Sequence, residues 1–114
     1  MKIQEVKREN FQEEYGILCH RIYPDDRAST PFGSSWCIVE PGKSTDPHDH
    51  EVGETFFILE GSGIMSIGGE TSSVTKGSVV YIPPFANHVL TNTSPSANLV
   101  FLSVWWEESA GRMQ

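Results

Sequence analysis

The sequence predicts an all-β protein that folds as a sandwich or a barrel, and three observations lead to this class. Short runs rich in Val, Ile, Phe, Thr and Trp recur along the chain. Segments of turn-forming residues separate these runs. Helical periodicity is weak except over residues 3–15, where it fits one or two turns. Many short strands without intervening helices are typical of sandwiches and barrels.

Each expected strand is an apolar or β-branched run that ends at a turn signal. The separators include EPGKS, EGSG, IGGE, TKG, IPPF and NTSPSAN. Gly68-Gly69 is the clearest two-residue hairpin turn, because glycine tolerates the positive φ angles that such a turn requires. The expected strands, in order, are residues 17–23, 35–40, 48–50, 55–60, 63–67, 71–74, 78–82, 88–92 and 99–106. No linker or repeat interrupts them, so we expect one domain over residues 1–114.

Composition and charge exclude several classes of partner. The 114 residues carry 15 acidic and 8 basic side chains, which argues against a nucleic-acid partner and against an anionic membrane surface. The polar N-terminus does not resemble a signal peptide, and the apolar runs FFIL and LVFL are too short to span a bilayer. Cys19 and Cys37 permit one disulfide, but two reduced thiols in a cytoplasmic protein are the expectation.

The stretch PHDHEVGE, residues 47–54, carries the first sign of chemistry. In an extended strand His48 and His50 point to the same face, and Gly53 allows the chain to turn so that Glu54 faces back toward them. Two imidazoles and a carboxylate suit divalent transition metals. A solvated polar hairpin is the alternative interpretation of this pattern taken alone.

The spacing of the surrounding residues resembles the two signature motifs of the cupin superfamily. These motifs are G-x(5)-H-x-H-x(3)-E-x(6)-G and G-x(5)-P-x-G-x(2)-H-x(3)-N, and nine of their ten fixed positions match. The matching residues are Gly42, His48, His50, Glu54 and Gly61 in the first motif, and Gly77, Pro83, His88 and Asn92 in the second. The resemblance covers residues 34–106 and leaves residues 1–33 as N-terminal strands or an extension.

The resemblance to small single-domain cupins carries further expectations. It implies a double-stranded antiparallel jelly-roll barrel with few or no helices. It also implies that His48, His50, Glu54 and His88 hold one divalent transition metal, whose identity (Fe, Mn, Ni or Zn) the sequence leaves open. Cupins often pair through outer strands, and residues 17–23 and 99–106 are apolar on both faces, so a homodimer is expected. The alternative is that residues 1–15 cover one of these faces.

Phe85 is the one departure from the motifs, because it stands where the family usually has glycine. That glycine serves a turn with unusual backbone angles. We expect Ala86-Asn87 to take over this role, since asparagine tolerates the left-handed region better than most residues. Phe85 itself either caps the mouth of the barrel or packs beneath a loop.

Residues outside the motifs give weaker signals. Glu60, Tyr81 and His20 are candidate catalytic residues, although a solvated position is the plainer interpretation of each. Neighbouring residues of a strand face opposite ways, so either Trp105 or Trp106 should lie at an interface or a pocket. No arrangement of nucleophile, base and orienting residue points to covalent catalysis.

The sequence therefore predicts a metal-dependent enzyme that acts on a small organic substrate, expected to be anionic, by dioxygenase, isomerase or lyase-type chemistry. The alternative is a metal-stabilised ligand-binding or accessory module. The segments SSWCIVEPGKST and LVFLSVWWE also resemble zinc-bound cupin modules that work with tRNA-synthetase-like enzymes.

Overall fold

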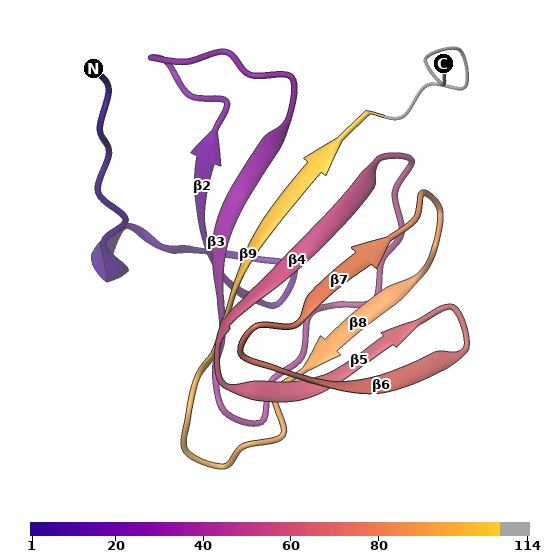
Figure 1. Ribbon diagram of the computed structural model, residues 1–114. Helices are drawn as coiled ribbons and strands as arrows, with labels where there is room; N and C mark the ends of the chain where they lie inside the picture. Colours follow the sequence, from indigo (N-terminus) through magenta and orange to yellow (C-terminus); the bar gives the residue numbers. More distant parts are fainter. Residues whose placement is uncertain (108–114) are drawn as a thin grey trace.

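The computed structural model describes residues 1–107, which form nine β-strands and one turn of 3₁₀ helix (Figure 1). The elements are η1 (Arg8–Asn10), β1 (Gln12–Glu14), β2 (Ile17–Tyr23), β3 (Gly33–Val39), β4 (Gly53–Glu60), β5 (Ser62–Ile67), β6 (Glu70–Thr75), β7 (Val79–Ile82), β8 (His88–Thr91) and β9 (Leu99–Trp106). Within these residues no helix has the length and apolar character needed to cross a membrane.

The strands form two antiparallel sheets, and this arrangement is the expected jelly roll (Figure 1). The larger sheet has the order β1-β2-β3-β9-β4-β7, and the smaller has the order β6-β5-β8. Residues 44–48 extend the smaller sheet beside β8, because Ser44 and His48 form bridges to Thr91 and His88. The long connection between β3 and β4 therefore crosses from one sheet to the other.

Most expected strands are confirmed, and β2 and β9 have the expected bounds. The strand expected at residues 48–50 is wrong. His48 makes one bridge to His88, and the chain then leaves β8 to enter β4. Pro47 has no N–H to donate to a ladder, which limits pairing on this side. The Gly68-Gly69 turn is confirmed, with Ile67 and Glu70 paired on either side of it.

The core lies between the sheets and follows the alternation along each strand. Phe56 of β4 packs on Phe101 of β9 with ring centroids 4.3 Å apart, and both side chains are almost fully buried. Ile82, Leu90 and Leu99 have no exposed surface. Each such side chain contributes about 1.5–3 kcal/mol when it leaves water, so this core holds the two sheets together.

Asn92 joins three segments at the far end of the barrel. Its fully buried side chain donates hydrogen bonds to the carbonyls of Val39, at 2.9 Å, and Ala97, at 2.8 Å. Its carbonyl oxygen Oδ1 accepts a hydrogen bond from the backbone of Ser94. The final asparagine of the second motif therefore ties backbone segments of the fold together.

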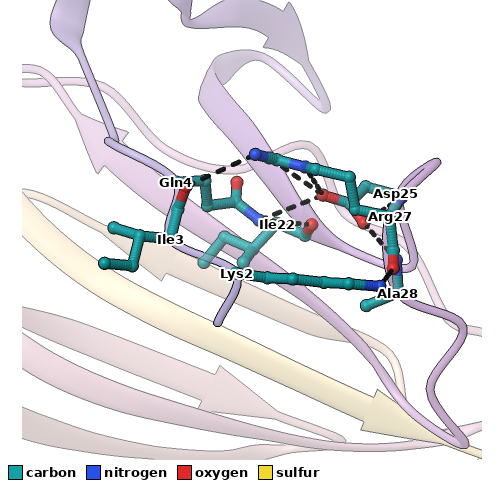
Figure 2. Close-up of polar contacts among 7 residues, drawn as sticks. All are labelled: Lys2, Ile3, Gln4, Ile22, Asp25, Arg27 and Ala28. Carbon is teal, nitrogen blue, oxygen red and sulfur yellow. Dashed lines mark hydrogen bonds and ion pairs between the residues drawn. The ribbon is translucent and has the colours of Figure 1, made fainter.

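The N-terminal segment packs against the outside of the β2–β3 hairpin (Figure 2). The Gln4 amide donates to the carbonyl of Ile22 at 3.3 Å, and Arg27 donates to the carbonyl of Ile3 at 3.3 Å. Lys2 donates to the carbonyl of Arg27. Of the helical turns expected in residues 3–15, only η1 is present. The segment contacts the end of β2 and the loop that follows it, and the homodimer stays a prediction.

Phe85 itself takes the left-handed backbone conformation, with φ of 68°, so the expectation that Ala86-Asn87 would do so is wrong. The turn is fixed by two hydrogen bonds: Phe85 N–H donates to the His50 carbonyl at 2.6 Å, and Ala86 N–H to the Pro83 carbonyl at 3.3 Å. The Phe85 side chain is 70% exposed and therefore does not pack beneath a loop.

Replacing Phe85 with glycine should relieve backbone strain, whereas replacing it with alanine should keep that strain. The left-handed conformation costs an L-residue about 1–2 kcal/mol, and glycine avoids this cost. Glycine also gives the unfolded chain more conformational entropy, which offsets part of the gain in stability. We expect Phe85→Gly to exceed Phe85→Ala in free energy of unfolding by about 1 kcal/mol. Urea denaturation of both variants tests this, and equal midpoints would show that the turn is unstrained.

Candidate metal centre

The structure brings the four predicted ligand residues together from three segments. His48 and His50 lie in the connection between β3 and β4, Glu54 lies near the start of β4, and His88 is the first residue of β8. One nitrogen from each histidine lies within 4.8 Å of the others. Glu54 Oε1 is 2.8 Å from His50 Nε2 and 3.5 Å from His88 Nε2. The cluster therefore sits between the two sheets.

A backbone carbonyl two residues away orients each imidazole. His48 Nδ1 lies 2.9 Å from the Asp46 oxygen, and His88 Nδ1 lies 3.0 Å from the Ala86 oxygen. His50 Nδ1 is 3.1 Å from the oxygen of Val52. A carbonyl oxygen only accepts hydrogen bonds, so each Nδ1 carries the proton. In the neutral rings Nε2 then keeps its lone pair, which is the state that binds a metal.

These tautomers fit a divalent cation between the rings and Glu54. An Nε2 lone pair and a carboxylate oxygen repel each other at 2.8 Å unless a proton or a cation lies between them. The Nε2 of His88 is buried and has no hydrogen-bond partner within the described residues. An unpaired buried nitrogen of this kind is costly unless it binds something. The donor set of nitrogen and oxygen suits Fe, Mn, Ni, Co or Zn.

The surroundings favour an ionised carboxylate at Glu54. Burial alone would raise the pKa of Glu54, but the polar groups of His88, Ser103 and His50 that face it lower this pKa below its ordinary value. Burial alone would lower the pKa of His88, and the neighbouring Glu54 carboxylate and Ala86 carbonyl raise it instead. The carboxylate is therefore negatively charged near neutral pH, as a metal ligand must be.

Ser103 and Tyr15 support the cluster, and neither was predicted from the sequence. The Ser103 hydroxyl, on β9, donates to Glu54 Oε2 and leaves Oε1 toward the histidines. The Tyr15 ring stacks on His48, with centroids 4.6 Å apart and planes 12° from parallel. Only the pairing of β9 with β4 brings Ser103 to this position, so no local motif marks it.

The turn that carries Tyr15 is tied to the loop that carries His48. Tyr15 and Gly16 both have positive φ angles and form a two-residue hairpin loop between β1 and β2. The Tyr15 carbonyl accepts a hydrogen bond from Asp46 N–H at 2.8 Å, and the Asp46 carbonyl in turn orients His48. A side chain at Gly16 would come within 2.7 Å of Asp46 Oδ1. The φ angle of 79° at Gly16 favours glycine here, and the Asp46 side chain would also have to move for any other residue.

The cluster opens into a cavity of about 260 Å³. Its walls come from the inward faces of β2, β3, β4 and β9 and from the β1–β2 turn. Apolar side chains such as Ile17, Phe56 and Phe101 line its deep end, and Glu14, Arg21 and Trp105 are among its other lining residues. The cavity is smaller than the usual pocket for a drug-sized ligand, so it suits a small molecule.

Cys19 and Cys37 face each other in this cavity. They are partners across β2 and β3, both are free thiols, and their sulfurs lie 3.5 Å apart. Contact between the thiols lowers the pKa of Cys19, and the same contact together with burial raises the pKa of Cys37 well above its ordinary value. The two reduced thiols that the sequence predicted are therefore present as a buried pair.

The structure places the three weaker catalytic candidates away from the residues that line the cavity. Glu60 is exposed at the end of β4 opposite to Glu54. Tyr81 is 51% exposed and stacks on Trp106, with ring centroids 6.3 Å apart. His20 lies under Phe11, with ring centroids 5.7 Å apart. Trp105 lines the cavity, as expected for one of the two adjacent tryptophans.

Comparison with known proteins agrees with this geometry. The family model of the cupin domain matches residues 35–105, which is more than half of the chain. The plu4264 protein of Photorhabdus luminescens, whose structure has been solved, is 31% identical and has a TM-score of 0.87. That match covers 93% of this chain and 88% of the solved one.

Two curated relatives are similar over a shorter stretch. An uncharacterized protein of Methanocaldococcus jannaschii is 41% identical over 77 residues, which are 67% of this chain and 62% of that protein. The dimethylsulfoniopropionate lyase DddW of Ruegeria pomeroyi is 42% identical over 76 residues, which are 65% of this chain and 50% of the lyase. The matches therefore span about half to three fifths of these relatives.

Replacing His48 and His50 together with alanine should abolish stoichiometric metal binding. Two of the four converging ligands would be lost, while the core between the sheets would stay intact. Plasma mass spectrometry of the purified variant should find almost no bound metal, and its circular dichroism should keep the β signal. Unchanged metal content would show that the ion is held elsewhere.

Replacing Ser103 with alanine should weaken metal binding without removing it. The variant loses the hydroxyl that orients Glu54, and the loss of such outer partners usually weakens metal affinity by about 10–100-fold. Competition with a chromogenic chelator measures the change. Ser35→Ala is the matched control, because Ser35 is the neighbour of Ser103 across β3 and β9 and also lines the cavity. Equal affinities in the two variants would contradict a role for Ser103.

Proposed function

This chain belongs to the cupin family, and we propose that it is a metal-dependent enzyme that acts on a small anionic organic substrate. One observation carries the proposal: the cluster of His48, His50, His88 and Glu54 opens into a cavity instead of being enclosed by side chains. A metal that only stabilised the fold would need no such space, because structural sites are closed. The hydrophobic core between the sheets contains none of these four residues.

In such an active site the side chains would exclude water, orient the ligands and set the net charge, while the metal would activate the substrate. A divalent ion bound here would supply Lewis acidity toward an oxygen of the substrate. Phe56 and Phe101 exclude water from the deep end of the cavity, and Ser103 keeps Glu54 oriented. Glu54 is the one anionic residue of the predicted ligand set, so the loaded centre keeps a net positive charge. That charge favours a carboxylate or an enolate as ligand.

Dioxygenase, isomerase and lyase-type reactions all suit this arrangement. The identity of the bound metal would help to distinguish between these reaction types. Chemistry with dioxygen calls for a redox-active ion such as iron, whereas isomerisation and elimination need only an ion that polarises an oxygen. The similarity to the lyase of Ruegeria pomeroyi supports elimination from a small carboxylate. We therefore place lyase-type chemistry first among the three.

Stripping the metal and adding back single ions should show a catalytic role. The metal-free protein should keep its fold and lose all turnover, because the hydrophobic core contains none of the four cluster residues. Fe, Mn, Ni, Co and Zn are restored one at a time, and each form is assayed for turnover of small acids, sugars and β-dicarbonyls and for its melting temperature. The His48→Ala, His50→Ala double variant is the control. A melting temperature that collapses without metal, with no turnover in any form, would contradict the proposal.

A further inference from the structure

Arg21 lies at the cavity and has no role in the metal centre. Ile17, Cys19 and Arg21 alternate along β2 and all line the cavity. Ile17 and Cys19 are buried, whereas Arg21 is exposed, so this row of side chains runs from the core to the rim. Arg21 is the one lysine or arginine among the residues that line this cavity. A positive charge at the rim therefore faces the same cavity as His48, His50 and Glu54.

The Arg21 side chain reaches along β2 instead of pointing into solvent. It meets Glu14, with Nη2 2.8 Å and Nε 3.1 Å from Oε1. Glu14 on β1 is the partner of Ile17 on β2. Ile17 precedes Arg21 by four residues, which corresponds to about 13 Å along the strand. The two side chains therefore lean toward each other past Cys19, and their ion pair lies along the cavity.

Trp105 holds the guanidinium from the other side. The guanidinium carbon of Arg21 is 5.7 Å from the centre of the Trp105 ring. The indole lies over Gly33, where a β-carbon would come within 2.2 Å of it. Glycine at this position lets the ring lie across β3 toward β2. A carboxylate and an aromatic face therefore orient the guanidinium. This arrangement suits an anion-binding site, and the Glu14 carboxylate occupies the place of the anion.

We propose that Arg21 binds the second anionic group of a substrate whose first anionic group faces the metal centre. This inference rests on the proposed function. The ion pair with Glu14 is an exchangeable one, because the two side chains are 57% and 25% exposed and such exposed pairs add little to stability. A substrate carboxylate takes the place of the Glu14 carboxylate on the same fork of donors. The substrate is then a dicarboxylate or a similar dianion.

The position of Arg21 in the sheet sets the length of this ligand. Arg21 is on β2 and Glu54 on β4, and the sheet order places β3 and β9 between them. Three strand spacings correspond to about 14 Å between the backbones of β2 and β4. The side chains of Arg21 and Glu54 extend into this space, so the gap between their charged groups is smaller. The two anionic groups must therefore be separated by a chain of several atoms. Glutarate has such separated groups, whereas malonate is too short.

Calorimetric titration of the nickel-loaded protein with glutarate and with pentanoate tests the assignment. The two acids have the same number of carbons and differ in the second carboxylate. We expect glutarate to bind at least about tenfold more tightly than pentanoate, since a charge-assisted hydrogen bond is worth that factor. Arg21→Gln should abolish the preference for glutarate over pentanoate. Glu14→Gln should increase the preference, because it removes the competing carboxylate.

The controls separate failure of this inference from failure of the proposed function. Arg27→Gln removes another arginine that is paired with a carboxylate but does not line the cavity, and it should change neither affinity. If Arg21→Gln is unfolded by circular dichroism, Arg21→Lys replaces it and should reduce the preference through loss of the two-point contact. A wild-type protein without the preference, or a variant that keeps it, overturns the role of Arg21. Acids that bind no better with nickel than without it overturn the proposed function, and this inference with it.

Discussion

The cluster of three imidazoles, with the buried carboxylate of Glu54 beside those of His50 and His88, sets the constraint around which this end of the barrel is built. The groups come from both sheets and from the connection between them, so they meet only when the sheets are closed on each other. Backbone carbonyls fix each Nδ1, and Ser103 fixes the carboxylate. Contacts within the protein therefore orient the donors, which lowers the entropic cost of binding an ion.

Two parts of the chain build the cavity beside this cluster, and only one of them lies within the residues that the family model matches. The ligand residues, Phe56 and Phe101 lie within the matched residues 35–105, whereas Glu14, Tyr15 and Arg21 precede them. The shared core therefore carries the metal-ligand cluster, and the N-terminal hairpin carries much of the wall that a substrate would contact. Relatives with the same core and a different hairpin would present a different wall to the substrate.

Phe85 shows how the turn beside the cluster departs from the family motif without disturbing it. The hydrogen bonds to His50 and Pro83 hold the backbone in the left-handed region although the residue is not glycine. An aromatic side chain is thereby displayed at the surface next to a ligand loop. The bridge between His88 and His48 fixes the start of β8 beyond this turn.

Local patterns in the sequence determined the strands, the turns and the identity of the converging residues. Alternation and glycine placement predicted β2, β9 and the Gly68-Gly69 hairpin, because these depend on neighbours in the chain. His48, His50, Glu54 and His88 were singled out together by the resemblance of their spacing to the cupin motifs. The expectation failed at residues 48–50 and at Phe85, where contacts with β8 and with His50 decide the backbone.

Tertiary structure alone decided which further side chains share the site. Ser103, Tyr15 and Arg21 reach the cavity through the order of strands in the larger sheet and through the docking of the β1–β2 turn on Asp46. Strand order cannot be read from alternation, because the same inward face can be paired with any neighbouring strand. The sequence thus determined which residues suit a metal, and the folding of the sheets decided which residues surround the space beside it.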